Sequence, residues 1–182
     1  MSLASDKFQF IFVRVPRTGS ATYYHYLRGC FDPYLIDVGS QHASAVELRG
    51  LWGEKWDQYQ TFGFIRNPWD WLVSLFYSGV SATPGPAEAW QGNKTSDILC
   101  RTNMDFETFV RQRKTTPMDW LIDGKHIIVD EILRFEDFKS RWKVRVSSAR
   151  GRPPYKSWYT PDLARYVGET FPLDIEIGKY VF

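Results

Sequence analysis

The sequence predicts an α/β fold, a three-layer sandwich in which a central parallel sheet is flanked by helices. Short apolar segments rich in β-branched and aromatic residues alternate with longer segments of helical periodicity, which is the order of βαβ units. The apolar segments are mostly bounded by Gly, Pro or Asp. Because 182 residues suit one core, we expect a single domain spanning residues 1–182.

The elements follow in order along the chain. Strands are expected at residues 8–13, 34–38, 61–65 and 127–129, with a further segment at 132–135. Helices are expected at residues 20–28, 44–51, 69–80, 106–113 and 161–171, and the third has apolar residues at helical spacing. Residues 81–97 contain several breakers and predict a loop. Residues 1–7 are expected to be a flexible N-terminus, with residues 1–3 resembling a cloning remnant.

Composition narrows the class of protein. Hydrophobic residues make up 43% and aromatic residues 17%, enough for a packed core. A net charge of +2 is too balanced for non-specific binding of nucleic acid. Cys30 and Cys100 lie far apart without a ligand spacing, so we expect no metal site. No apolar run approaches the ~20 residues of a membrane span, and we expect a soluble cytoplasmic protein.

The segment FIFVRVPRTGSATYYHYL, residues 10–27, passes from a strand through a turn into a helix. Free backbone N–H groups and the helix dipole favour an anion there, and Thr18, Ser20 and Thr22 add hydroxyl groups. A nucleoside-triphosphatase P-loop would have the form GxxxxGK[ST], which is absent. The same residues also fit a plain helix start, with Ser20 as the N-cap and Gly19 in the turn.

A second junction, TFGFIRNPWDWLVSLFYS, places Arg66 at the end of a strand and Ser74 in the helix that follows. The carboxyl ends of parallel strands meet at one edge of a sheet, where open α/β sheets bind ligands. Two anion sites at one edge predict a ligand with two separated anionic groups. Taken singly, Arg66 would be a surface ion pair and Ser74 a helix-surface hydroxyl.

Together, FVRVPRTGSATYY and FGFIRNPWDWLVSLFYS resemble the 5′-phosphosulfate loop and the 3′-phosphate motif of sulfotransferases that use 3′-phosphoadenosine-5′-phosphosulfate (PAPS). The carbohydrate-sulfotransferase branch is the most similar. QHASAVELRG, GKHIIVDEILRFEDF, YKSWYTPDLARYV and DIEIGKYVF extend the resemblance over most of residues 8–182. It implies a P-loop-related sulfotransferase fold, PAPS as sulfuryl donor without a metal, and a hydroxyl acceptor on a glycan.

The resemblance also implies site residues. The 5′-phosphosulfate would be bound by Arg17, Thr18, Gly19, Ser20, Ala21 and Thr22, the 3′-phosphate by Arg66 and Ser74, and both would be covered by Arg150 and Arg152. A solvated basic loop is the alternative for the last pair. Arg17 stands where the family has lysine, and the stretch between Arg134 and Tyr155 is short. Arginine cannot release its proton, so Arg17 can only stabilise charge.

An acceptor hydroxyl needs a proton acceptor, and histidine suits neutral pH. His42 follows a predicted strand at the start of ASAVELRG, where the resemblance implies the general base; the alternative is a simple helix-start residue. We expect the transfer rate to fall on the acid side with an apparent pKa within about a unit of 6.5. His25 and His126 are expected to be packed or solvated.

Two other functions remain open. A module that binds PAPS or another nucleotide without transferring sulfate is favoured by the arginine at position 17. A nucleotide kinase of related fold is weakened by the missing Gly-Lys-Ser/Thr sequence.

Overall fold

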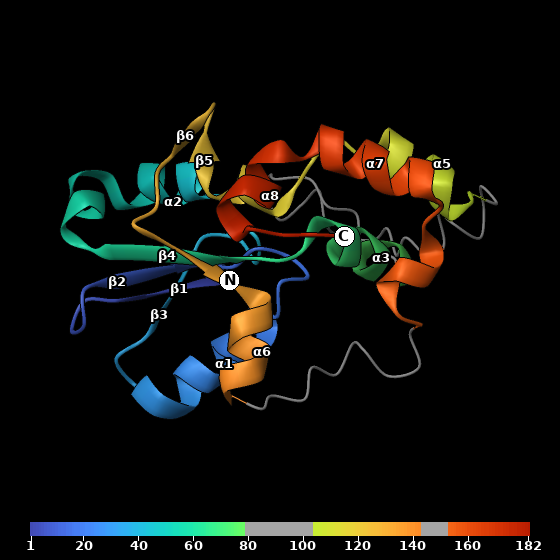
Figure 1. Ribbon diagram of the computed structural model, residues 1–182. Coiled ribbons are helices and arrows are strands. Elements are labelled where there is room, and N and C mark those ends of the chain that lie inside the picture. The colour runs from blue at the N-terminus through green and yellow to red at the C-terminus, as the bar shows by residue number, and fades with distance from the viewer. Residues whose placement is uncertain (79–103, 143–152) are drawn as a thin grey trace.

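The computed structural model describes residues 1–78, 104–142 and 153–182, in which helices cover a central sheet (Figure 1). The sheet has five strands in the order β3-β1-β2-β4-β7. β2 (Phe10–Val13), β4 (Gln60–Ile65) and β7 (Glu131–Arg134) pair in parallel, with Phe12 opposite Phe62 and Phe64 opposite Leu133. The predicted α/β class is therefore confirmed.

The N-terminal segment corrects two expectations. Ser2–Ser5 forms β1, which pairs antiparallel with both β2 and β3 (Ile36–Val38), so residues 1–7 are not a flexible tail and the sheet is mixed rather than parallel. All four residues of β1 are completely buried. The Ser2 hydroxyl accepts the Arg14 N–H at 3.1 Å and the Ser5 hydroxyl donates to the Tyr34 carbonyl at 2.9 Å. These tertiary bonds satisfy the two serines, whose polarity hides the strand in the sequence.

Helices lie on both faces of the sheet. α1 (Ser20–Phe31) and α6 (Phe135–Trp142) cover one face through an aromatic cluster, which includes Phe12, Phe64 and Phe138. α2 (Ala45–Trp52) and α8 (Pro172–Gly178) cover the other. Beyond the ends of β2 and β4, α3 (Pro68–Ser78) packs with α5 (Phe106–Gln112), α7 (Pro161–Thr170) and the short helix η5 (Tyr155–Trp158).

The C-terminal half contains one further difference. Residues 127–129 are not a strand of the main sheet, because β5 (Ile122–Asp123) and β6 (His126–Ile127) form a separate hairpin and β7 takes the sheet position. The further strand expected at 132–135 corresponds to β7. Two short helices, η1 (Gly53–Gln58) and η3 (Pro117–Trp120), complete the described elements. The predicted loop at 81–97 and the end of the 69–80 helix lie outside the described residues.

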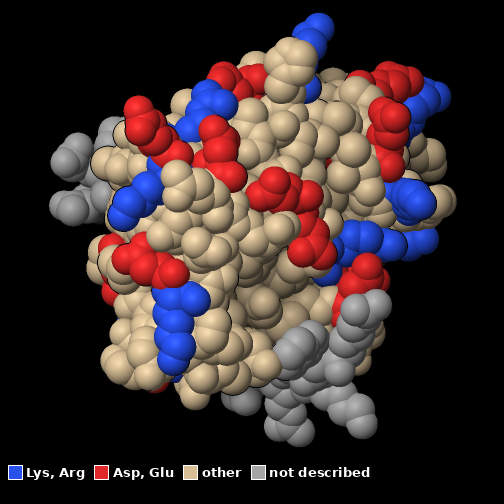
Figure 2. Space-filling model, turned by 90° about the vertical axis from the view of Figure 1, so that its left-hand side faces the viewer, with Lys and Arg blue, Asp and Glu red and all other residues tan. Residues whose placement is uncertain are grey.

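Figure 2 shows the side of the molecule that lies to the left in Figure 1, on which acidic and basic side chains are interspersed. Across the described ranges, no helix is both long and apolar enough to cross a membrane.

Candidate functional site

The turn between β2 and α1 is built around the carbonyl of Val15. This oxygen accepts hydrogen bonds from the Thr18 hydroxyl at 2.9 Å and from the Ser20 hydroxyl at 2.6 Å. Gly19 is the N-cap of α1 with φ +75°, and a Cβ there would lie 2.6 Å from the Phe135 ring. Only glycine therefore fits at this position.

These bonds change the roles of the two hydroxyl residues. Thr18 and Ser20 are buried and donate their hydrogens inside the turn, so their hydroxyls stabilise the loop rather than donate to a ligand. The groups of this turn that can bind an anion are its backbone N–H groups. α1 has no side-chain cap and no acidic residue in its first turn. Ala21 is exposed and Thr22 half-buried in that turn. An uncapped helix start with this composition suits an anion.

Arg66 lies directly beside this turn. It is 5% exposed, and its Nε and Nη2 donate to one carboxylate oxygen of Asp70 at 2.8 and 2.5 Å. Its Nη1 donates to the Arg17 carbonyl at 2.8 Å, and its guanidinium lies 4.5 Å from the centre of the Phe135 ring. Arg66 is thus a buried residue that joins the two strand-to-helix junctions, not the surface ion pair of the alternative reading.

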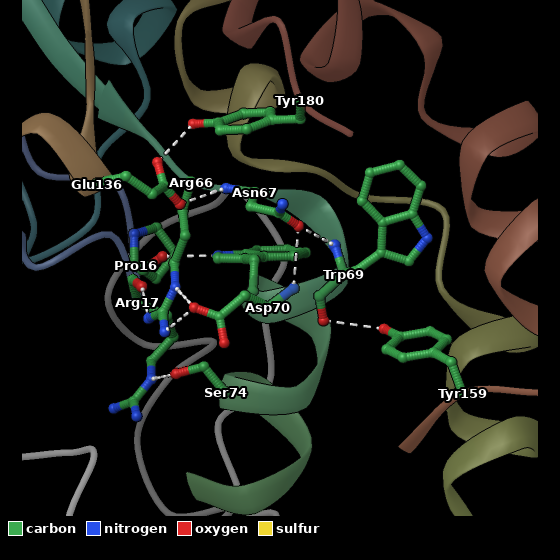
Figure 3. A network of polar contacts seen from close by, with 11 residues as sticks. Pro16, Arg17, Arg66, Asn67, Trp69, Asp70, Ser74, Glu136, Tyr159 and Tyr180 are labelled. Atoms are coloured by element: carbon green, nitrogen blue, oxygen red, sulfur yellow. Dashed lines mark hydrogen bonds and ion pairs between the residues drawn. The ribbon is translucent and has the colours of Figure 1, made fainter. Parts of the chain in front are cut away.

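The two predicted anion motifs also meet through their side chains. Arg17 Nε donates to the Ser74 hydroxyl at 3.1 Å, across 57 positions of sequence (Figure 3). Arg17 has φ +62°, a left-handed conformation that a non-glycine residue rarely adopts. This backbone conformation and the Arg66 bond to its carbonyl fix the Arg17 position. The structure therefore brings Arg17, Arg66 and Ser74 together.

Residues that the sequence did not single out support this junction. The Asn67 side-chain oxygen accepts the Trp69 N–H at 3.1 Å, and the Asn67 N–H donates to Glu136 at 2.9 Å. Glu136 also accepts from the Tyr180 hydroxyl at 2.9 Å. Asp70 could have been found from its i, i+4 spacing to Arg66. Glu136 and Tyr180 carry no such signal, because they reach the site from distant parts of the chain (Figure 3).

His42 lies at the same edge of the sheet, in the turn before α2. Its Nδ1 is 2.8 Å from the Arg14 carbonyl, and its own carbonyl accepts the Trp120 indole N–H at 2.9 Å. A carbonyl can only accept, so Nδ1 carries the hydrogen and Nε2 carries the lone pair. The N-cap of α2, Ser44, follows two residues later and forms a capping box with Glu47.

Burial lowers the pKa of His42 to about 4, and the cations of Arg14 and Arg17 contribute to this shift. The pKa of His42 in the ligand-free protein thus lies well below that of an ordinary histidine, and the apparent pKa expected for transfer stays a prediction. Arg14 was also missed in the sequence: it is 7% exposed, donates to the Met1 carbonyl at 3.0 Å and stacks 4.5 Å from the Tyr24 ring centre. His42 is thus a neutral imidazole in a cationic environment.

The remaining predicted residues lie elsewhere. His25 and His126 are exposed, as befits solvated residues. Arg150 and Arg152 lie outside the described residues. Within the described part of the chain, His, Cys, Asp and Glu residues form no group of three that could hold a metal ion.

Comparisons with models of known protein families, with curated proteins and with solved structures found no match. The arrangement itself provides fixed cations, a hydroxyl, an uncapped helix start and a neutral imidazole at one edge of the sheet. These groups can bind an anion and accept a proton.

Proposed function

We propose that the protein is a sulfotransferase that moves a sulfuryl group from PAPS to a hydroxyl of a glycan. The observation that carries the proposal is the contact between Arg17 and Ser74, braced by Arg66. It unites the two segments that resemble the phosphosulfate and 3′-phosphate motifs, which lie far apart in the sequence. The fold would then be of the P-loop-related sulfotransferase type.

The donor would be held by groups of both junctions. The backbone at the start of α1 and the Arg17 guanidinium suit the 5′-phosphosulfate, and the Ser74 hydroxyl suits the 3′-phosphate. PAPS, when bound, supplies an activated sulfuryl group for direct in-line transfer, so preorganised donors carry most of the catalysis. Because Arg66 is buried and paired with Asp70, its main part is to fix the turn and add positive potential.

His42 would act on the acceptor. Its Nδ1 bond to the Arg14 carbonyl sets the tautomer in which Nε2 is the basic nitrogen, and this nitrogen would accept the proton of an attacking hydroxyl. A bound polyanion would offset the nearby cations that depress the His42 pKa, which moves this base toward the range useful at neutral pH. Donor binding would thereby strengthen the base.

The test combines transfer and binding. Radiolabelled PAPS is incubated with the protein and a panel of glycans, and the affinities of the product 3′-phosphoadenosine-5′-phosphate (PAP) and of ATP are measured by calorimetry. We expect label transfer to a glycan and tighter binding of PAP than of ATP. His42→Ala should abolish most transfer but keep PAP binding, whereas His25→Ala, an exposed histidine, should change neither. Equal affinity for PAP and ATP contradicts the proposal.

A PAPS-binding module without transferase activity is the second candidate. The observation that favours it is the His42 pKa of about 4, since so weak a base accepts a proton poorly at neutral pH. Tight PAP binding without transfer to any glycan, and with a His42 pKa that stays near 4 in the complex, would support this function instead.

A further inference from the structure

A slot runs along the outer edge of the sheet. β7 is the last strand in the sheet, and all four of its residues line a cavity of about 560 Å³. On one side the cavity is lined by Tyr23 of α1, Phe64 of β4 and Phe138 of α6, and on the other by Ile177, Gly178 and Lys179 at the end of α8. We call this cavity the β7 slot.

The backbone of β7 presents hydrogen-bonding groups to the slot. Asp130, just before the strand, donates its N–H to Thr61 of β4. In a parallel pair, alternate residues direct their N–H and C=O groups to the same neighbour. Ile132 and Arg134 therefore bond toward β4, and the groups of Glu131 and Leu133 face the slot. No strand among the described residues pairs with this edge.

The two walls of the slot differ in charge. Leu133 packs in the cluster with Phe64 and Phe138, so Glu131, two residues earlier, lies on the same side. Asp137 joins that wall, which is aromatic and acidic. Ile132 packs in the other cluster, and Arg134 on its side lies 5.0 Å from the Tyr180 ring centre. With Lys179, this second wall is aliphatic and basic.

The edge is recessed between these walls. A second copy of the protein would present its own β7 between its own helices, so two such edges cannot approach to pairing distance. A single extended chain can enter, because strands pair at about 4.8 Å and four residues extend about 13 Å. The shape therefore selects a lone strand as occupant.

We propose that the β7 slot binds an extended peptide segment of a partner protein by strand addition. Basic and aromatic side chains of this peptide alternate with acidic ones. Main-chain bonds to Glu131 and Leu133 provide affinity, and the two walls select the alternating side chains. The basic and aromatic residues face Glu131, Asp137 and the aromatic wall, and the acidic residues face Arg134 and Lys179.

The probe is a capped hexapeptide, Lys-Asp-Phe-Glu-Lys-Asp, and its control is Lys-Lys-Phe-Asp-Asp-Glu, which has the same composition without alternation. Binding to the full chain is measured by calorimetry. We expect the alternating peptide to bind at least tenfold more tightly. Equal binding of the two, or no binding of either, overturns the proposal.

Two variants test the main-chain bonds. Leu133→Pro removes an N–H that faces the slot and leaves the hydrogen bonds between β7 and β4 intact. Leu133→Ala also shortens the leucine side chain but keeps this N–H. The proline variant should bind the alternating peptide at least tenfold more weakly than the alanine variant. Equal affinities overturn strand addition.

A third variant serves if the proline variant does not fold. Lys179→Glu should weaken binding of the alternating peptide. The same variant should bind a second peptide, in which lysine replaces each acidic residue, more tightly than the wild type does. Unchanged preferences contradict the assigned walls. A protein dimer that the peptide dissociates in sedimentation experiments would make a second copy the occupant and also overturn the proposal.

Discussion

The backbone conformation of Arg17 helps to fix the position of its side chain. A left-handed conformation in a non-glycine residue costs about 1 kcal/mol or more and persists where the surroundings impose it. Here the Arg66 bond to the Arg17 carbonyl and the packing of Gly19 against Phe135 fix the turn. The strained backbone of Arg17 thus occurs at the residue whose guanidinium is held beside Ser74.

The first prediction concerns Arg17. If its charge stabilises the sulfuryl group during transfer, Arg17→Ala should lower turnover by about 100-fold or more and PAPS affinity much less. Arg17→Lys should keep part of the rate, since it keeps the charge. Steady-state kinetics and PAP calorimetry measure the two effects, with the exposed Arg165→Ala as control. Equal losses in both would make Arg17 an anchor for the donor only.

The second prediction concerns the pKa of His42. NMR titration should give a pKa of about 4 without ligand and a higher value with PAP, because the bound anion counters Arg14 and Arg17. By the same linkage, the ligand-free folded state disfavours a protonated His42, so stability is lost as pH falls from about 6.5 to about 4. A pKa that PAP leaves unchanged would mean that the nucleotide binds away from this histidine.

At the scale of elements, the start of α3 depends on a buried ion pair. Arg66 and Asp70 bond to each other one helical turn apart, and their side chains are 6% and 17% exposed. Breaking a buried pair by removing one partner leaves an uncompensated charge, which costs more than removing both. The pair therefore ties the position of α3 to the turn that carries Arg17.

The third prediction follows from this pair. Arg66→Ala should destabilise the protein by about 3 kcal/mol, because it leaves the Asp70 carboxylate without Arg66 and the Arg17 carbonyl without its donor. The double variant Arg66→Ala/Asp70→Ala should recover much of that loss in urea unfolding. If the double variant is less stable than the single one, the pair is not the main contribution of Arg66.

Another element contact involves a buried acid. Asp174 in the first turn of α8 is 1% exposed and accepts the Met118 N–H of η3 at 3.3 Å. Its second oxygen has no hydrogen-bond partner among the described residues. Burial raises the pKa of Asp174 to about 7, and the nearby Asp119 carboxylate adds to the shift. The folded state therefore favours the protonated form of Asp174, because burial penalises the charge of its carboxylate.

The fourth prediction is the resulting pH dependence. The pKa of Asp174 is higher in the folded state than its ordinary value of 3.8, so its contribution to stability is complete below about pH 4 and is lost as pH rises through 7. Asp174→Asn should be more stable than the wild type at pH 8, and the difference should vanish near pH 4. Thermal melts at both pH values check this, and a constant difference would contradict it. His42 changes stability with pH in the opposite direction, so the melting temperatures of His42→Gln should be measured in parallel.

At the scale of the molecule, continuity of the sheet depends on the first few residues. β1 lies between β3 and β2, so β3 reaches the rest of the sheet only through β1. Leu3 is completely buried in the aromatic cluster, and Arg14 beside His42 bonds to Ser2 and to the Met1 carbonyl. The N-terminal strand thus supports both the core and the candidate site.

The fifth prediction tests this strand. Leu3→Asp should cost more than about 4 kcal/mol, a large share of the stability of a typical domain, because it buries a charge in the core. Lys7→Asp introduces the same side chain at an exposed position two residues beyond β1 and should cost only about 1 kcal/mol, from the lost contact of Lys7 with the Tyr34 ring. Equilibrium unfolding in urea compares them. Similar stabilities would show that β1 contributes little to the fold.

The sequence alone determined the α/β class, the helices near residues 20–28, 44–51 and 161–171, and the strands near 8–13 and 61–65, because apolar periodicity and bounding Gly, Pro and Asp residues are local signals. It also located two strand-to-helix turns as candidate anion sites. It could not reveal β1, because the two serines of SLAS are polar and their burial is possible only through hydrogen bonds to residues distant in the sequence.

Only the tertiary structure decided the chemistry of each side chain. The Thr18 and Ser20 hydroxyls bond inside their own turn, Arg66 is buried on Asp70, and the His42 pKa is lowered by burial and nearby cations. Hydrogen-bond partners and desolvation depend on which segments fold together, and residues as distant as Arg17 and Ser74 meet only in three dimensions. A residue's type and spacing fix its possible partners, and the packed fold determines which of them it contacts.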